Sequence, residues 1–176
     1  YVQKQLDLVS KGIGGFIFFG GSREQITSFI GQIQEAAQVP LFLASDIERG
    51  VAQQIQGTTP FPSQMAVAAA IDMKRHEDRH TLANALCAFA AEINDIGLNM
   101  ALLPVLDVNS NPDNPIICTR AFSDDPQTVA ALGAYYIKTL QSCGILTCAK
   151  HFPGHGDTSI DSHIELPHIK KRRSAL

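Results

Sequence analysis

The 176-residue sequence lacks several features that would assign it to a particular class of protein. It contains no apolar run that reaches the roughly 18 residues needed to cross a membrane. Lysine and arginine total 14 against 17 aspartate and glutamate residues, and the net charge of −3 offers nothing to nucleic acid or to an anionic membrane. The one basic run, 170–173, could be a targeting signal or a nucleic-acid-binding patch, but the solvated face of a helix explains it equally well. We therefore expect neither a nucleic-acid partner nor a membrane partner.

Cysteine is also scarce. The four cysteines include no C-x-x-C pair, and each lies in or beside an apolar run: Cys87, Cys118, Cys143 and Cys148. Such surroundings favour buried, reduced thiols over disulfides. No signal peptide is visible, so we expect a cytoplasmic location, with export as the alternative because the chain opens in what looks like the middle of a domain.

The sequence does contain a regular alternation of two patterns. Short apolar runs bounded by glycine or polar residues predict buried strands at 12–19, 41–44, 98–106 and 145–149. Helical spacing of apolar residues follows a capping box at Ser22, recurs from Glu77, and follows an N-cap with a proline behind it at Asp125. The segment after the second strand is expected to be a polar loop, and a further helix is expected from about residue 168 onward.

Buried strands that alternate with amphipathic helices predict an α/β fold, with a parallel sheet and helices outside it. A dinucleotide-binding sheet would carry G-x-G-x-x-G after its first strand, where this sequence has only Gly20 and Gly21. Polar residues end every predicted strand, which is typical of the active-site end of a barrel. Residues 1–176 are therefore predicted to form one partial domain, an incomplete (β/α)8 TIM-type barrel made of about its first four strand–helix units.

A half-barrel of this kind needs a partner. Its edge strands are unpaired, and we expect inward side chains such as Phe16, Phe18, Leu41 and Leu43 to face the missing half. The expected partner is the remainder of the barrel or a second copy of the chain.

The densest group of reactive side chains follows the fourth predicted strand. Residues 150–163 hold three histidines, two aspartates and a lysine, on a backbone that Pro153, Gly154 and Gly156 keep irregular. Three interpretations are open: a polar surface loop, a metal site or an acid/base site. The candidate ligands for zinc or manganese are His151, His155, Asp157, Asp161 and His163.

The acid/base interpretation depends on Asp161 and His163, which lie two residues apart and can face one cavity. A carboxylate bonded to one ring nitrogen orients the imidazole and raises its pKa, so that the other nitrogen can pass a proton to a leaving group. The metal interpretation is weaker, because His151 and His155 have helical spacing in a loop that cannot be helical. We favour acid/base chemistry and expect no metal or organic cofactor.

Lys150 to His163 resembles the signature K-H-F-P-G-H-G-D-T-x-x-D-S-H of family 3 glycoside hydrolases, and more narrowly that of their bacterial β-N-acetylglucosaminidase branch. Residues 104–109, P-V-L-D-V-N, and residues 114–122, which begin N-P-I-I and end R-A-F, are similar to two further segments of the family. The resemblance runs from about residue 10 to residue 167.

This resemblance implies a retaining exo-β-glycosidase that removes a terminal β-linked N-acetylglucosamine, for example from cell-wall fragments. His163 would be the general acid/base, held by Asp161. The nucleophilic aspartate of the family lies on a later strand, and no aspartate in this chain fits its motif. Asp107 is either a supporting or a loop-anchoring carboxylate, or a direct participant. The side chains implied to bind sugar hydroxyls are Asp46, Arg120, Lys150 and His151.

The resemblance leaves other functions open. The same fold could act as a β-glucosidase or a glycoside phosphorylase, and a non-catalytic sugar-binding module is an alternative of another class. The family reads D-x-E-G-G-R-V-x-R after the second strand, whereas Val51 and Gln54 replace both arginines here and Arg49 replaces a glycine. We expect these replacements to bear on the preferred sugar or aglycone.

Overall fold

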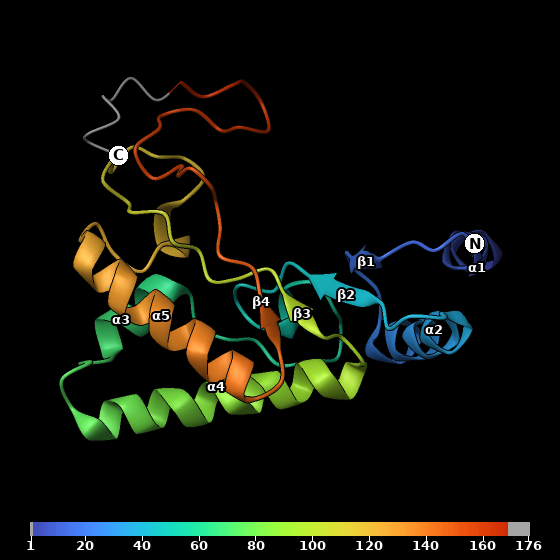
Figure 1. Cartoon of the computed structure of the whole chain (residues 1–176). Coiled ribbons are helices and arrows are strands. Elements are labelled where there is room, and N and C mark those ends of the chain that lie inside the picture. The colour runs from blue at the N-terminus through green and yellow to red at the C-terminus, as the bar shows by residue number, and fades with distance from the viewer. Residues whose placement is uncertain (1, 169–176) are drawn as a thin grey trace.

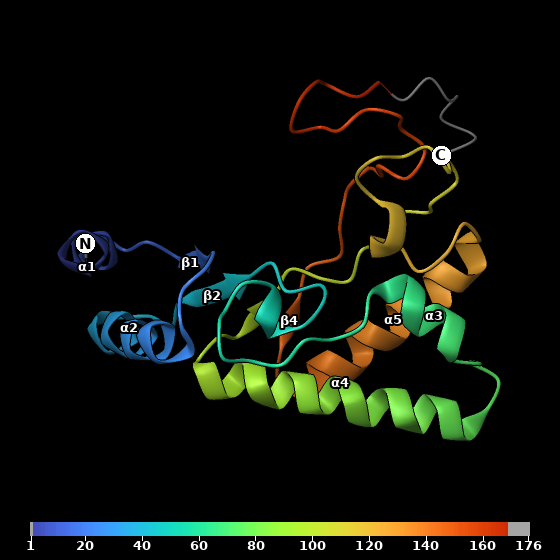
Figure 2. The same ribbon diagram turned by 180° about the vertical axis from the view of Figure 1, so that it is seen from behind.

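The computed structural model describes residues 2–168, which form a parallel sheet with helices packed against one of its faces (Figure 1). The strands follow one another across the sheet in chain order: β1 (Gly15–Phe18), β2 (Phe42–Ser45), β3 (Met100–Ala101) and β4 (Leu146–Thr147). Helix α2 (Arg23–Ala36) connects β1 to β2, α4 (His76–Ile96) precedes β3, and α5 (Pro126–Ser142) precedes β4. Seen from behind, α4 runs beneath the sheet, beside α5 (Figure 2). The predicted α/β fold is confirmed: four parallel strands and the helices between them form part of a barrel.

The helix ends follow the local chemistry of the sequence. The Ser22 side chain accepts from the backbone N–H of Gln25, whose own side chain accepts from the backbone of Ser22, so the predicted capping box is present. Asp125 caps α5 by accepting two backbone N–H groups. Gly97 ends α4 in the left-handed region at φ 93°. No helix in the described part of the chain is long and apolar enough to span a membrane.

Four further elements were not predicted: α1 (Val2–Ser10), α3 (Gln64–Ala70) and the 3₁₀ turns η1 (Val51–Gln53) and η2 (Cys118–Arg120). The expected polar loop after β2 is therefore wrong in part. Helix α3 is short and rich in alanine, so its sequence shows no clear apolar period. It is capped by Ser63, and the Gln64 side chain is buried and makes two hydrogen bonds with the backbone of Val105. The helix expected from about residue 168 lies outside the described residues.

Strands β3 and β4 are much shorter than predicted, because the ladder between them is interrupted. Pro104 has no N–H to contribute to it, and the N–H of Cys148 contacts the carbonyls of both Ala101 and Leu103. Pairing resumes as an isolated parallel bridge between Val105 and Lys150. The chain therefore keeps its direction beyond β4 and carries Lys150 to the edge where β2 also ends.

The two faces of the sheet are the reverse of the sequence-based assignment. Phe18 is buried against Phe29 of α2, with ring centroids 6.0 Å apart, and Leu43 is also buried in the core under the helices. Ile17 and Phe42, both 56% exposed, lie on the opposite, open face of the sheet. The prediction that Phe16, Phe18, Leu41 and Leu43 face the missing half-barrel was wrong, because β1 is apolar at every position and its sequence does not show which alternate residues point inward.

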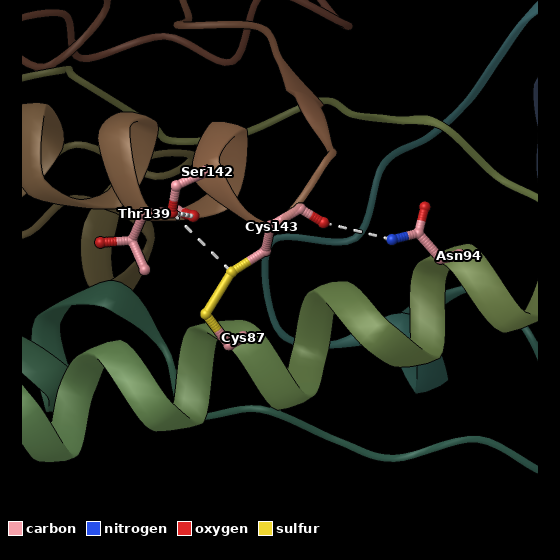
Figure 3. Close-up of a disulfide and its surroundings, with 5 residues drawn as sticks. All are labelled: Cys87, Asn94, Thr139, Ser142 and Cys143. Carbon is pink, nitrogen blue, oxygen red and sulfur yellow. Dashed lines mark hydrogen bonds between the residues drawn. A yellow bond between two sulfur atoms is a disulfide. The ribbon is translucent and has the colours of Figure 1, made fainter.

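The prediction of reduced, buried cysteines was also wrong. Cys87 of α4 and Cys143 at the end of α5 form a disulfide, with their Cα atoms 5.8 Å apart (Figure 3). Both lie where the two helices pack, Cys87 exposed and Cys143 half-buried, and the packing of α4 against α5 brings them together. Asn94 of α4 donates to the Cys143 carbonyl at 3.3 Å beside the disulfide. Cys118 is exposed and Cys148 is half-buried, and both are free thiols.

Candidate active site

The C-terminal edge of the sheet gathers the polar side chains that follow its strands. Asp46 follows β2 directly, Asp107 lies in the loop after β3, and Lys150 and His151 follow β4. Arg120 comes from η2, within the long segment between β3 and α5. Because parallel strands end at the same edge, residues more than a hundred positions apart meet there.

Two cations and two carboxylates form a connected cluster at this edge. Lys150 Nζ donates to Asp46 Oδ1 at 2.5 Å and lies 2.6 Å from Glu48 Oε1. Arg120 donates through Nε and Nη2 to the two oxygens of Glu48, each at 2.8 Å. Burial acts to raise the pKa of Glu48, but the hydrogen bonds from Arg120 and Lys150 outweigh it and lower that pKa to about 2. The cluster is therefore built around a buried carboxylate that stays ionised at neutral pH.

Asp107 anchors the loop that follows β4. It is 1% exposed; its Oδ2 lies 2.6 Å from His151 Nδ1, and its Oδ1 accepts the backbone N–H of His155 at 2.5 Å. These hydrogen bonds outweigh burial, which alone would raise the pKa of Asp107, and lower it. His151 Nε2 lies 3.2 Å from Arg120 Nη2. An ionised carboxylate only accepts and a guanidinium only donates, so His151 carries its proton on Nδ1 and accepts at Nε2. Of the roles left open for Asp107, these contacts support the loop anchor.

The loops after β3 and β4 hold each other in place. They lie side by side above the sheet, in yellow and red, in both views (Figures 1 and 2). Asn114, which is 2% exposed, donates from its side chain to the His155 carbonyl at 2.7 Å. At Gly156 the two backbones approach so closely that a Cβ atom would lie 1.8 Å from the Val108 carbonyl oxygen. Only glycine fits there, which gives the predicted irregular backbone a structural cause.

Asp161 and His163 make the contact that the sequence predicts. Asp161 Oδ1 lies 2.7 Å from His163 Nδ1 and also accepts the His163 backbone N–H at 2.9 Å. The backbone hydrogen bond, followed by the side-chain one, lowers the pKa of Asp161. The His163 side chain is 76% exposed, so Nε2 is open to a ligand. Among the described residues, the hydrogen bonds and ion pairs join this dyad to no member of the Glu48 cluster, so their approach to one substrate stays a prediction.

The metal interpretation gains no geometric support from these side chains. Across residues 2–168, no group of three or more histidine, cysteine, aspartate or glutamate side chains is arranged to hold an ion. The rings of His151 and His155 stand edge to face with their centroids 6.5 Å apart. His155 Nδ1 instead faces Thr158 Oγ1 at 2.5 Å.

The structure brings all four predicted sugar-binding residues together at one edge of the sheet. The roles of these four residues and of the dyad stay predictions, because geometry alone does not test them. The sequence-based reasoning missed Glu48 and the loop-anchoring residue Asn114. Glu48 lies in the turn after β2, and no local signal in the sequence points to its contacts with the two cations. Val51 is fully buried in the core, so this replacement of a family arginine does not face the cluster.

Comparison with known proteins shows which family has this sequence and fold. Residues 2–176 match the family described as "Glycosyl hydrolase family 3 N terminal domain". The chain is 37% identical over 181 residues to "Beta-hexosaminidase A" of Pseudoalteromonas piscicida, with 97% of the chain and 30% of that protein covered. Its fold superposes with a TM-score of 0.85 on a family 3 β-N-acetylglucosaminidase from Paenibacillus sp., at 32% identity, covering 97% of this chain and 33% of that one.

The structure of NagZ from Neisseria gonorrhoeae in complex with N-trifluoroacetyl-D-glucosamine also has a TM-score of 0.85, at 28% identity. It covers 98% of this chain and 52% of that protein. The chain thus spans about a third to a half of the length of these relatives. The match covers the sheet, the helices and the loops that carry the cluster. The chain belongs to glycoside hydrolase family 3 and matches its N-terminal domain.

Proposed function

We propose that the protein containing this chain is a retaining exo-β-N-acetylglucosaminidase. The proposal is supported mainly by one observation: Asp46, Arg120, Lys150 and His151 meet at the C-terminal edge of a parallel sheet. Lys150 and His151 begin the segment that leads to the Asp161–His163 pair. Relatives with similar folds are named for this activity. The proposed chemistry uses no metal or organic cofactor. Terminal N-acetylglucosamine on short glycans such as cell-wall fragments is the proposed substrate.

In the first proposed step, protonated His163 gives its Nε2 proton to the glycosidic oxygen as the bond to the anomeric carbon breaks. Asp161, on Nδ1, holds the ring and balances the charge of the imidazolium. An aspartate from the remainder of the barrel attacks the anomeric carbon and forms a glycosyl–enzyme intermediate. In the second step water attacks that carbon, neutral His163 takes the proton from the water, and the aspartate leaves, so that the configuration of the sugar is retained.

Four side chains of the cluster would bind the hydroxyl groups of the sugar. Asp46 is 32% exposed and uses Oδ1 for Lys150, which leaves Oδ2 as an acceptor. Lys150 and Arg120 supply donors beside it, and the proposed contact with His151 Nε2 would replace the one that this nitrogen accepts from Arg120. A sugar hydroxyl both donates and accepts, so a carboxylate next to a cation suits it well.

The remainder of the barrel is the proposed partner of the open face of the sheet. Ile17 and Phe42 are 56% exposed and Leu146 is 44% exposed on the strands of this face. Leaving several such side chains in water forfeits about 1.5–3 kcal/mol each. The length of the relatives beyond this region accommodates four further strands. Covering this open face would also complete the rim of the active site and supply the nucleophile.

The test is hydrolysis of 4-nitrophenyl β-N-acetylglucosaminide by the protein that contains this chain. We expect turnover with retention, seen by NMR as the β-anomer of free N-acetylglucosamine forming first. The matched 4-nitrophenyl β-glucoside should react more slowly. Faster reaction of the glucoside would indicate a β-glucosidase, and dependence on inorganic phosphate would indicate a phosphorylase. Sugar binding without turnover would indicate a non-catalytic module.

A further inference from the structure

Glu48 has the least exposed side chain of the cluster, at 4%, yet it contacts both cations. Its Oε1 is shared between Arg120 Nη2 at 2.8 Å and Lys150 Nζ at 2.6 Å, while Oε2 accepts Arg120 Nε at 2.8 Å. Both oxygens of this carboxylate are therefore occupied by the protein. A sugar cannot reach Glu48 without displacing one of the two cations.

The N–H groups of Arg120 show what Glu48 controls. Nε and one N–H of Nη2 go to Glu48, the other N–H of Nη2 faces His151 Nε2 at 3.2 Å, and Nη1 donates to the Ile116 carbonyl at 3.1 Å. A guanidinium has five N–H groups in one plane, so one N–H on Nη1 remains for a ligand. The bidentate contact with Glu48 fixes that plane and hence the direction of the remaining donor.

Lys150 depends on Glu48 in a similar way. Its ammonium group has three N–H donors, of which one goes to Asp46 and one faces Glu48. Glu48 thus draws the ammonium away from a one-to-one pair with Asp46. It also screens Lys150 from Arg120, since the two cations meet on the same oxygen.

We propose that Glu48 is a positioning residue that sets the direction in which Arg120 and Lys150 present their remaining N–H donors to the sugar. This inference rests on the proposed function, because it assumes that the ligand of the cluster is a sugar. The charge of Glu48 agrees with this role: its pKa is lowered to about 2, so the carboxylate is anionic at neutral pH. Asp46 is the exposed carboxylate that meets the sugar, and Glu48 is the buried one that orients the donors.

The substitution Glu48→Gln tests this role, because it keeps the shape of the side chain and removes its charge. The amide has one oxygen and no charge, so the bidentate contact with Arg120 is lost: with the oxygen at the Oε1 position, the NH2 group faces Arg120 Nε. We expect the KM for 4-nitrophenyl β-N-acetylglucosaminide to rise about 10- to 100-fold, with a smaller change in kcat, as expected for misdirected binding donors. Glu77→Gln on α4, where the side chain is 80% exposed, is the matched control and should leave both constants unchanged.

A double-mutant cycle separates positioning from a merely structural role. If Glu48 acts through Arg120 and Lys150, Glu48→Gln should raise KM by a smaller factor in an Arg120→Ala background than in the wild type, because only its effect on Lys150 remains. Additive effects would overturn the inference, and so would an unchanged KM in a Glu48→Gln protein that melts like the wild type. Should Glu48→Gln fail to fold, Glu48→Asp retains the charge on a side chain too short to reach both cations. A raised KM for Glu48→Asp would support positioning, and a wild-type KM would overturn it.

Failure of the proposed function can be distinguished from failure of the inference about Glu48. A wild-type protein that neither binds nor hydrolyses the sugar would refute the proposed function and, with it, a positioning role toward sugar. A wild-type protein that is active, together with a Glu48→Gln variant of unchanged KM, would refute the inference alone.

Discussion

Replacing Asp107 by asparagine should weaken the fold around the active site by a predictable amount. Asp107 is 1% exposed and accepts from His151 Nδ1, the His151 backbone N–H and the His155 backbone N–H. Asparagine can offer one oxygen to these donors, and its NH2 group would then face the others. Hydrogen bonds to a charged group contribute about 1.5–3 kcal/mol each. Losing at least one and leaving buried donors unpaired should cost about 3–5 kcal/mol of unfolding free energy.

The assay is thermal unfolding of the wild type, Asp107→Asn and the control Asp113→Asn, which alters an exposed residue of the same segment. At neutral pH, Asp107→Asn should lower Tm by about 10 °C and the control should not. The pKa of Asp107 is lowered in the folded state, so its stabilising contribution is present above the unfolded pKa of about 4 and is lost as the pH falls through the folded value. The difference in Tm should therefore shrink at strongly acidic pH. A difference that is absent at neutral pH, or equally large in strong acid, would refute the reasoning.

Three further predictions follow from other contacts. Arg120→Ala should weaken the binding of N-acetylglucosamine about 10- to 100-fold by calorimetry, because it removes a charged donor from the cluster; unchanged affinity would exclude Arg120 from the sugar site. Alkylation of the unreduced, denatured protein should modify Cys118 and Cys148 but not Cys87 and Cys143, which should react only after reduction. Reaction of Cys87 and Cys143 without reduction would contradict the disulfide, whereas a disulfide formed in the cell would favour export over the cytoplasm. Gly156→Ala should raise KM and destabilise the loop, because its Cβ would overlap the Val108 carbonyl oxygen; wild-type kinetics would show that the loop is not held there.

The disulfide should also stabilise the fold, by an amount that can be calculated from the chain entropy of the unfolded state. The two cysteines are 56 residues apart in the sequence. Closing a loop of that length removes about 4 kcal/mol of chain entropy from the unfolded state, on a model that neglects residual structure. The Cys87→Ser, Cys143→Ser double variant should therefore unfold at lower denaturant concentration than the wild type. An unchanged midpoint would mean that the pairing contributes nothing.

The features that the sequence predicted well are those determined by neighbours in the chain. The capping box at Ser22 and the N-cap at Asp125 need only three or four consecutive residues. The contact of Asp161 with His163 is equally local. The alternation of strands and helices is a periodic property that length and spacing reveal.

The features it missed depend on contacts between distant residues. The pairing of Glu48 with Arg120 joins residues 72 positions apart, and no local pattern distinguishes Glu48 from a solvated glutamate. The inward face of β1 was misassigned because an apolar residue at every position leaves the alternation undefined. The disulfide was missed for a similar reason, since Cys87 and Cys143 are 56 positions apart and meet only where α4 packs against α5.

The most direct test of the central claim compares wild type and His163→Ala on β-N-acetylglucosaminides that differ only in their leaving group. If His163 protonates the glycosidic oxygen, the variant should hydrolyse a substrate with a poor leaving group, such as an alkyl glycoside, about 10²–10⁴-fold more slowly. A dinitrophenyl glycoside needs little protonation, so formation of its glycosyl–enzyme intermediate, measured as the burst of released phenolate, should be slowed far less. An unchanged rate on the poor leaving group, or activity restored to the variant by zinc, would contradict the assignment of His163 as the acid/base.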